Sequence, residues 1–148
     1  MSYDVARPYT AAFVIFRRQG KIAFVLRENT GWMNGYYGLA SGKVEKNESY
    51  LNAAIREAKE EVDIDLTADN LKYAHTMHRK SSADQTWVDV YFEAVDWKGE
   101  PYNAEPHVHK ELKWVDIKQL PENVIPPVRH ALDQIAKGYQ YSEYGWKE

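Results

Sequence analysis

The chain has 148 residues, of which 44% are hydrophobic and 28% are charged, a balance typical of a soluble globular protein with one core. Its formal net charge of −3 argues against a general binder of nucleic-acid polymers, because such a protein needs a basic face. Cysteine is absent from the sequence, which excludes disulfides, zinc–thiolate sites and thiol catalysis. Neither a signal peptide nor a membrane span is recognisable, so we expect one cytoplasmic domain over 1–148 with no membrane partner.

Hydrophobic periodicity and turn residues divide the chain into strands and helices. Two buried strands joined by a turn at Gly20 are expected first, and a glycine-rich loop then leads to Gly42. One helix is expected from about Ser49, as its N-cap, to Val62, and a second begins at Pro126. The expected strands cover 11–16, 23–26, 71–80, 86–95 and 112–115. This order favours an α/β (α+β) fold with a mixed β-sheet between helices.

The most informative segment runs from Gly42 to Ile64 and reads GKVEKNESYLNAAIREAKEEVDI. Glu57, Glu60 and Glu61 are spaced i, i+3, i+4 in it, so they share one arc of the expected helix. Like charges at this spacing destabilise a bare helix by a few tenths of a kcal/mol per pair. Beside that arc, at about 100° per residue, an apolar stripe is formed by Leu51, Ala54, Ile55, Ala58 and Val62.

Two interpretations of these carboxylates are open. A solvated acidic face is the usual explanation of such a run. A divalent cation is the alternative, because Mg²⁺ and Mn²⁺ take oxygen ligands and would reverse the repulsion. Arg56 is placed to reach back to Glu48, which would hold the preceding loop against the helix. The glycine loop, Arg56 and Glu48 favour the metal, and a metal beside such a loop suggests phosphate chemistry.

This segment resembles the Nudix box, G-x5-E-x7-R-E-U-x-E-E-x-G-U, in which U is a bulky aliphatic residue. Ala58 and Asp63 depart from the pattern, since the family has a bulky residue and a glycine at these positions. That glycine is expected to end the helix in the left-handed conformation, in which Asp is a tolerable substitute. The positions that match with intact spacing are Gly42, Glu48, Arg56, Glu57, Glu60, Glu61 and Ile64. Flanking segments extend the resemblance over most of the chain.

The resemblance implies a Nudix-type α/β/α sandwich and a MutT-like, divalent-metal-dependent hydrolase. Mg²⁺ is the expected metal, with Mn²⁺ as the alternative. The catalytic residues that it implies are Glu48, Arg56, Glu57, Glu60 and Glu61. We expect Glu57 and Glu61 to be metal ligands and Glu60 to be a ligand or the general base, because members differ over which residue takes the proton.

Two further metal contacts follow from the resemblance. The backbone carbonyl of the residue before the first box glycine often joins the metal shell in the family, and that residue is Ser41. MutT-like members place another metal-binding Glu downstream, and Glu105 occupies that position, with Glu111 as its rival. The alternative is that Glu105 is an acidic loop residue that binds no metal.

Substrate contacts are harder to predict from the sequence. Arg27 is placed like the family's strand-end arginine, so it is a candidate phosphate contact, with a surface arginine as the alternative. Gly42 is a second candidate, because it lies in the loop beside the expected phosphate. Tyr37 would stack on a base or pack its loop. In MutT-like guanine-readers an Asn before the last helix hydrogen-bonds the purine, and this chain has Ile125 there. Its apolar side chain cannot make that bond, which argues against specificity for oxidised guanine.

The expected reaction is attack of water on the phosphorus of a nucleoside diphosphate linked to another moiety, as in a nucleoside triphosphate or a nucleotide sugar. Bound divalent ions would lower the pKa of a bound water and stabilise the leaving phosphate. A catalytically silent Nudix-fold nucleotide-binding module is the alternative, although silent members tend to lose box glutamates. The chain is expected to be a monomer or a homodimer. Its aromatic tail, YQYSEYGW, would close over the site or form part of a dimer contact.

Overall fold

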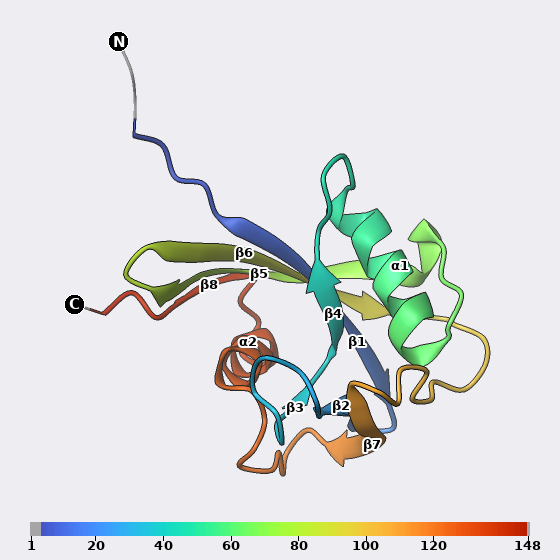
Figure 1. The fold of residues 1–148 in the computed structure, drawn as a ribbon. Helices are drawn as coiled ribbons and strands as arrows, with labels where there is room; N and C mark the ends of the chain where they lie inside the picture. Colours follow the sequence, from blue (N-terminus) through green and yellow to red (C-terminus); the bar gives the residue numbers. More distant parts are fainter. Residues whose placement is uncertain (1–3, 148) are drawn as a thin grey trace.

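The computed structural model describes residues 4–147, which form an eight-stranded sheet and two helices (Figure 1). The strands are β1 (Tyr9–Arg18), β2 (Lys21–Arg27), β3 (Tyr37–Gly38), β4 (Ala40–Lys43), β5 (Leu71–Ser82), β6 (Gln85–Ala94), β7 (His109–Asp116) and β8 (Tyr141–Tyr144). The helices are α1 (Tyr50–Val62) and α2 (Pro126–Ala136), and a 3-10 turn covers Ala68–Asn70. Within residues 4–147, neither helix is long and apolar enough to cross a membrane.

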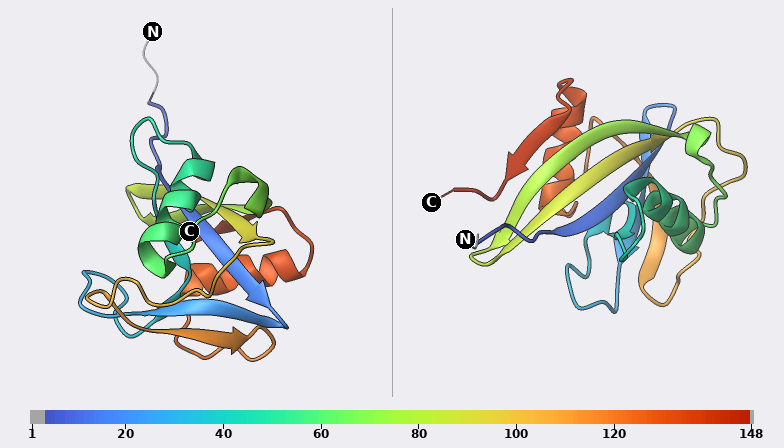
Figure 2. Two further views of the ribbon diagram at one scale, coloured as in Figure 1. Left: turned by 90° about the vertical axis from the view of Figure 1, so that its right-hand side faces the viewer. Right: turned by 90° about the horizontal axis from the view of Figure 1, so that it is seen from above.

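The sheet is mixed, as the sequence predicts. Its main path runs β3-β2-β1-β6-β5-β8, with β4 paired to β1 and β7 paired to β2. The pairs β1–β6 and β5–β8 are parallel, whereas the other pairs are antiparallel. Figure 2 shows the long β5–β6 hairpin with α1 on one side of the sheet and α2 on the other. The predicted α/β/α sandwich is therefore confirmed.

Alternation of side chains along β1 separates the interior into two cores. Val14 and Phe16 point into the core that α1 covers, whereas Phe13 and Ile15 point toward α2. The predicted apolar stripe of α1 packs into or against the first core. The second core receives the buried face of α2, made by Val128, Ala131 and Leu132. The strand β4 follows the same division, since its Ala40 packs into the α1 core and the preceding Leu39 packs into the α2 core.

Both ends of α1 follow from local sequence. The Ser49 hydroxyl accepts a hydrogen bond from the backbone N–H of Asn52 at 3.0 Å, so the predicted N-cap is confirmed. At the other end, Asp63 adopts the left-handed conformation, with φ 56° and ψ 45°. The next N–H, of Ile64, then donates back to the carbonyl of Ala58 at 3.3 Å. Asp63 therefore ends α1 as the family's glycine is expected to do. This departure from the box pattern does not affect the positions of the carboxylates.

The aromatic tail differs most from expectation, because part of it forms β8. This strand pairs with β5 at the edge of the sheet, between Thr76–Tyr141 and Arg79–Tyr144. Buried His75 joins the two strands, since its ring nitrogens lie 2.8 Å from the carbonyl oxygen of Tyr139 and 2.7 Å from the hydroxyl of Ser142. The tail therefore extends the sheet, and His75 is a hydrogen-bonded structural residue.

Candidate active site

Arg56 joins α1 to the loop that precedes it. Its Nε donates to Glu48 Oε2 at 2.8 Å, and its Nη2 donates to Glu48 Oε1 at 2.9 Å. The same Nη2 donates to the backbone carbonyl of Lys43 at 3.1 Å. These hydrogen bonds from Arg56 lower the pKa of Glu48 to about 2. The contact between Arg56 and Glu48 expected from their spacing is present, and it fastens the loop to the helix.

Two of the box carboxylates, Glu57 and Glu61, lie where α1 meets β4. Glu57 is only 9% exposed, and its carboxylate occupies the space that a Cβ on Gly42 would need. The backbone N–H of Ser41 donates to Glu61 Oε1 at 3.2 Å. Gly42 is therefore needed for close approach, because any side chain at this position would displace Glu57.

Burial raises the pKa of both carboxyl groups. The pKa of Glu57 rises to about 7, even though Arg56 Nη1 lies 3.0 Å from Glu57 Oε2. For Glu61, burial and then the charge of Glu57 raise the pKa well above its usual value. Two carboxylates in such surroundings are unfavourable unless a proton or a cation is shared between them. Their oxygen donors and their excess negative charge fit a hard divalent cation.

The remaining candidate ligands differ in their surroundings. Glu60 is exposed and pairs with Arg56 Nη1 at 3.2 Å. The backbone N–H of Ala104 donates to the carbonyl of Glu61 at 3.0 Å, so the neighbouring Glu105 lies beside the end of α1 that carries Glu61. Glu111 instead accepts a hydrogen bond from the hydroxyl of Tyr37 at 2.6 Å. Within residues 4–147, no three His, Asp or Glu side chains form a complete metal-binding group.

A cleft of about 400 Å³ adjoins the carboxylates on the α2 face of the sheet. Ser41, Gly42 and Glu61 line it from the direction of β4 and α1. Its apolar lining includes Phe13, Val25, Leu39, Ile125 and Val128. A cleft of this size, apolar with a few polar groups, is typical of small-molecule sites. Along the chain the lining ends at Val128, so the aromatic tail takes no part in it.

Of the two other predicted substrate contacts, Arg27 lines the cleft and Tyr37 does not. Arg27 ends β2 and lines the cleft, where its Nε donates to the carbonyl of Trp32 at 2.9 Å and its Nη2 to the Thr30 hydroxyl at 3.1 Å. Burial lowers the pKa of Arg27, and the charge of Glu61 opposes that shift. Tyr37 is buried with its ring edge-on to Phe24 and is not among the lining residues. Its position favours loop packing over stacking on a base.

Six polar or aromatic residues of the lining were missed by sequence reasoning: Lys43, Arg79, Gln85, Trp87, Asp89 and His109. Alternation along the second predicted strand of the hairpin does place Trp87 and Asp89 on one face, which is the only local signal for them. Arg79 comes from the neighbouring strand β5, and no motif connects it to them. His109 is buried, and its Nδ1 has no hydrogen-bond partner among residues 4–147.

Known proteins resemble the chain over most of its length. The sequence profile of the NUDIX domain matches residues 6–135. A MutT NUDIX hydrolase from Burkholderia pseudomallei is 28% identical, with a TM-score of 0.78 over 87% of this chain and 98% of that chain. The E. coli dihydroneopterin triphosphate pyrophosphohydrolase shares the fold, with 20% identity and a TM-score of 0.67 over 90% of this chain and all 100% of that one. So does a bifunctional NMN adenylyltransferase/ADP ribose pyrophosphatase from Francisella tularensis, complexed with AMP and a Mn ion, with 18% identity and a TM-score of 0.70 over 92% and 43% of the two chains.

Proposed function

The chain belongs to the Nudix family, and from this premise we propose that it is a divalent-metal-dependent hydrolase. Its substrate would be a nucleoside diphosphate linked to another moiety, such as a nucleoside triphosphate or a nucleotide sugar, cleaved by attack of water on phosphorus. The observation that carries the proposal is the pair of buried Glu57 and half-buried Glu61 beside β4, whose mutual repulsion a divalent cation would relieve.

The residues proposed to hold Mg²⁺ or Mn²⁺ are Glu57, Glu61, Ser41 and Glu105. The N–H and C=O of one strand residue point in the same direction. Because the N–H of Ser41 donates to Glu61, we expect the carbonyl of Ser41 to face the same edge of β4. Glu105 is preferred to Glu111 because it follows Ala104, whose N–H donates to the carbonyl of Glu61, whereas Glu111 accepts a hydrogen bond from Tyr37. When bound, the cation would supply a more acidic water and charge neutralisation at the phosphate.

The other site residues would position the substrate and move a proton. Arg56 and Glu48 would keep the loop after β4 fixed against α1. Glu60 is exposed beside this pair, where it can serve as the general base or as an additional ligand. Arg27 lines the cleft within range of the charge of Glu61, so we propose that it contacts a phosphate of the substrate. The apolar part of the cleft would then receive the organic group.

The test is a hydrolysis screen in which the products are identified, with Mg²⁺ and with EDTA. The panel spans canonical and oxidised nucleoside triphosphates, ADP-ribose, nucleotide sugars, dinucleoside polyphosphates and NADH. We expect Mg²⁺-dependent release of a nucleoside monophosphate, and loss of about two orders of magnitude in rate in Glu61→Gln, the scale of a lost charge-stabilising group. The matched control is Glu122→Gln, because Glu122 is exposed and forms no ion pair within residues 4–147.

Two outcomes would contradict the proposal. If Glu61→Gln retains full Mg²⁺-dependent hydrolysis, Glu61 is not a metal ligand. If nucleotides bind but no member of the panel is cleaved, the chain is instead a silent binding module.

A further inference from the structure

Arg79 is held in one orientation at the side of the cleft that lies across the sheet from β4. Its Nε donates to Asp89 Oδ2 at 2.7 Å, and its Nη2 donates to Asp89 Oδ1 at 3.2 Å. Asp89 is 0% exposed, and the Arg79 side chain is 11% exposed. The guanidinium carbon also lies 4.8 Å from the centre of the Trp87 ring. A carboxylate and an indole therefore fix the plane of this guanidinium.

Strand register places this cluster on the sheet face that forms the cleft. Trp87 lies opposite Arg79 on β5 and opposite Tyr9 on β1. Since side chains two residues apart share a face, Tyr9 and Phe13 point to the same side of β1. Phe13 in turn lies opposite Ser41, which adjoins the box carboxylates. The cluster and the carboxylates are therefore on opposite sides of the cleft, with apolar Phe13 between them.

The chemistry of the cluster favours an uncharged acceptor. Arginine has five N–H donors, and Asp89 uses two, which leaves donors on Nη1 and Nη2. The charge of Arg79 is already balanced by Asp89, so a second anion would gain less than at an unpaired arginine. A fork of two donors matches two adjacent acceptor atoms, and O6 and N7 of guanine are such a pair. Adenine presents N7 beside an amino donor, which would face an N–H of Arg79.

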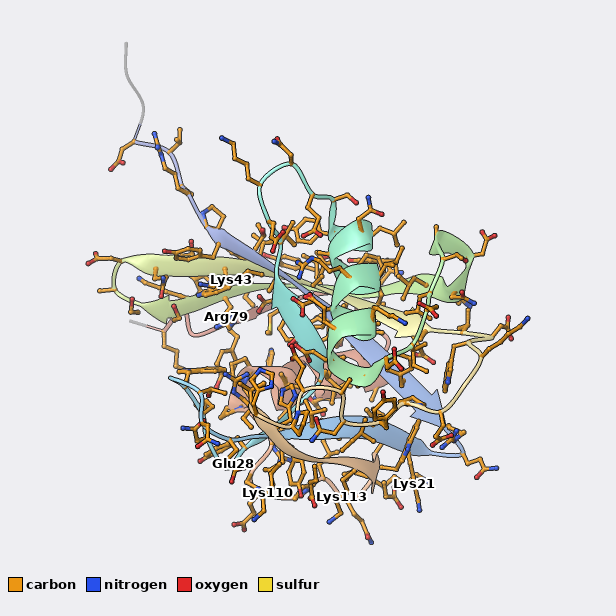
Figure 3. All side chains as sticks on the ribbon, turned by 45° about the vertical axis from the view of Figure 1, so that its right-hand side comes forward. Lys21, Glu28, Lys43, Arg79, Lys110 and Lys113 are labelled. Carbon is orange, nitrogen blue, oxygen red and sulfur yellow. The ribbon has the colours of Figure 1, made fainter. Side chains whose placement is uncertain are left out.

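Lys43 adds a second cation beside the same ring. Its Nζ lies 5.8 Å from the centre of the Trp87 ring and 5.1 Å from that of Tyr9. Figure 3 labels Lys43 and Arg79 on this part of the molecule, near the β5–β6 hairpin. Lys43 comes from β4, and its ammonium group is a point charge without the planar donor fork of an arginine. This arrangement leaves Arg79 as the group with a fixed donor fork.

We propose that Arg79, oriented by Asp89 and Trp87, determines purine specificity by donating to O6 and N7 of a 6-oxopurine nucleotide. Guanine and hypoxanthine would be favoured over adenine. The inference rests on the proposed function only in taking the ligand to be a nucleotide. It assigns base recognition to the β5–β6 hairpin, whereas apolar Ile125 lines the cleft from the segment before α2.

The test is calorimetric binding of GMP, IMP and AMP without metal, which does not depend on turnover. IMP shares O6 and N7 with GMP but lacks the 2-amino group. We expect GMP and IMP to bind about 5-fold or more tightly than AMP, the lower end for a bidentate arginine–guanine contact. Arg79→Lys keeps a positive charge beside Asp89 but removes the planar fork, so GMP and IMP should fall to the affinity of AMP.

The matched control is Arg17→Lys, because Arg17 pairs with Glu93 at 3.3 Å and is not part of the cleft lining. It should keep the preference for GMP, and thermal unfolding should show that both variants are folded. Equal affinity for the three nucleotides overturns the inference. So does an equal loss of GMP and AMP affinity in Arg79→Lys, which would indicate a phosphate contact.

Binding and turnover separate this inference from the proposed function. A preference for GMP without Mg²⁺-dependent hydrolysis of any nucleotide contradicts the hydrolase proposal alone. Hydrolysis of nucleotides without any purine preference contradicts the role of Arg79 alone. Failure of GMP, IMP and AMP to bind overturns the role of Arg79, whereas the hydrolysis screen still decides the hydrolase proposal.

Discussion

Arg56 and Arg79 both bind carboxylates, but they differ in how many negative charges surround them. Arg56 lies within 3.9 Å of four carboxylates, those of Glu45, Glu48, Glu57 and Glu60. Within residues 4–147 Arg79 has one carboxylate partner, Asp89, which is completely buried. The region around Arg56 therefore keeps an excess of negative charge, which suits cations. The Arg79–Asp89 pair is balanced, which suits an uncharged hydrogen-bond acceptor.

The largest effect is expected from Asp89→Ala, which breaks the balanced pair. It would leave the Arg79 guanidinium buried without its counterion, so we expect a loss of about 3 kcal/mol or more in the free energy of unfolding. Urea denaturation measures this loss. Glu100→Ala is the matched control, because Glu100 forms a pair with Arg18 at 2.8 Å but on the exposed surface. Equal urea midpoints for the two variants would show that burial does not distinguish these pairs.

Gly42→Ala tests the carboxylate-rich region. The added methyl group would overlap the Glu57 carboxylate, and we expect Mg²⁺-dependent hydrolysis to fall about 100-fold, since small misplacements at reacting centres have effects of this size. The rate is measured with a nucleotide that the wild type cleaves. Gly31→Ala is the control, because a Cβ on Gly31 would meet nothing within 4 Å. A fully active Gly42→Ala protein would mean that the position of Glu57 is unimportant.

The pH dependence of stability reports on His109 in the cleft. Burial is the main cause that lowers the pKa of His109 from 6.5 to about 4. Between these values the unfolded chain binds a proton that the folded protein does not. The free energy of unfolding should therefore decrease as pH falls from 6.5 to 4, by up to about 1.4 kcal/mol per pH unit. Urea midpoints across this range should show a shallower slope in His109→Gln, and an unchanged slope would refute this origin.

Ser49→Ala is expected to have the smallest effect on stability. It removes the hydroxyl that accepts from the N–H of Asn52 at the start of α1, which should cost about 1 kcal/mol in the free energy of unfolding. The control is Ser82→Ala at the exposed end of β5. If both variants have the wild-type midpoint in urea, the Ser49 cap does not stabilise α1.

The region around Arg56 could be predicted from the sequence because its contacts are local. The apolar stripe, the N-cap at Ser49, the pairing of Arg56 with Glu48 and the left-handed Asp63 all depend on residues within one helix and its flanking loop. Helical periodicity and spacing determine such contacts. The roles of the carboxylates in binding metal were suggested by family resemblance and remain predictions.

The Arg79 region could not be predicted in the same way. Its pair with Asp89 depends on the register of the β5–β6 hairpin, which is irregular at two places. The strand β8 joins β5 through contacts such as that between His75 and Ser142, 67 residues apart. A short polar strand gives little signal in its own sequence, and its position is determined by tertiary pairing. The local sequence therefore does not distinguish Arg79 and Asp89 from ordinary strand residues.

The most direct test of the central claim is a titration with Mn²⁺ followed by electron paramagnetic resonance. The account predicts that the wild type binds Mn²⁺ and that Glu61→Gln weakens its affinity at least 10-fold, whereas Glu122→Gln binds like the wild type. Glu57→Gln should behave like Glu61→Gln, because the two carboxylates form one site. If the wild type binds no Mn²⁺, or if Glu61→Gln binds it as tightly as the wild type does, the carboxylates at α1 are not a metal site.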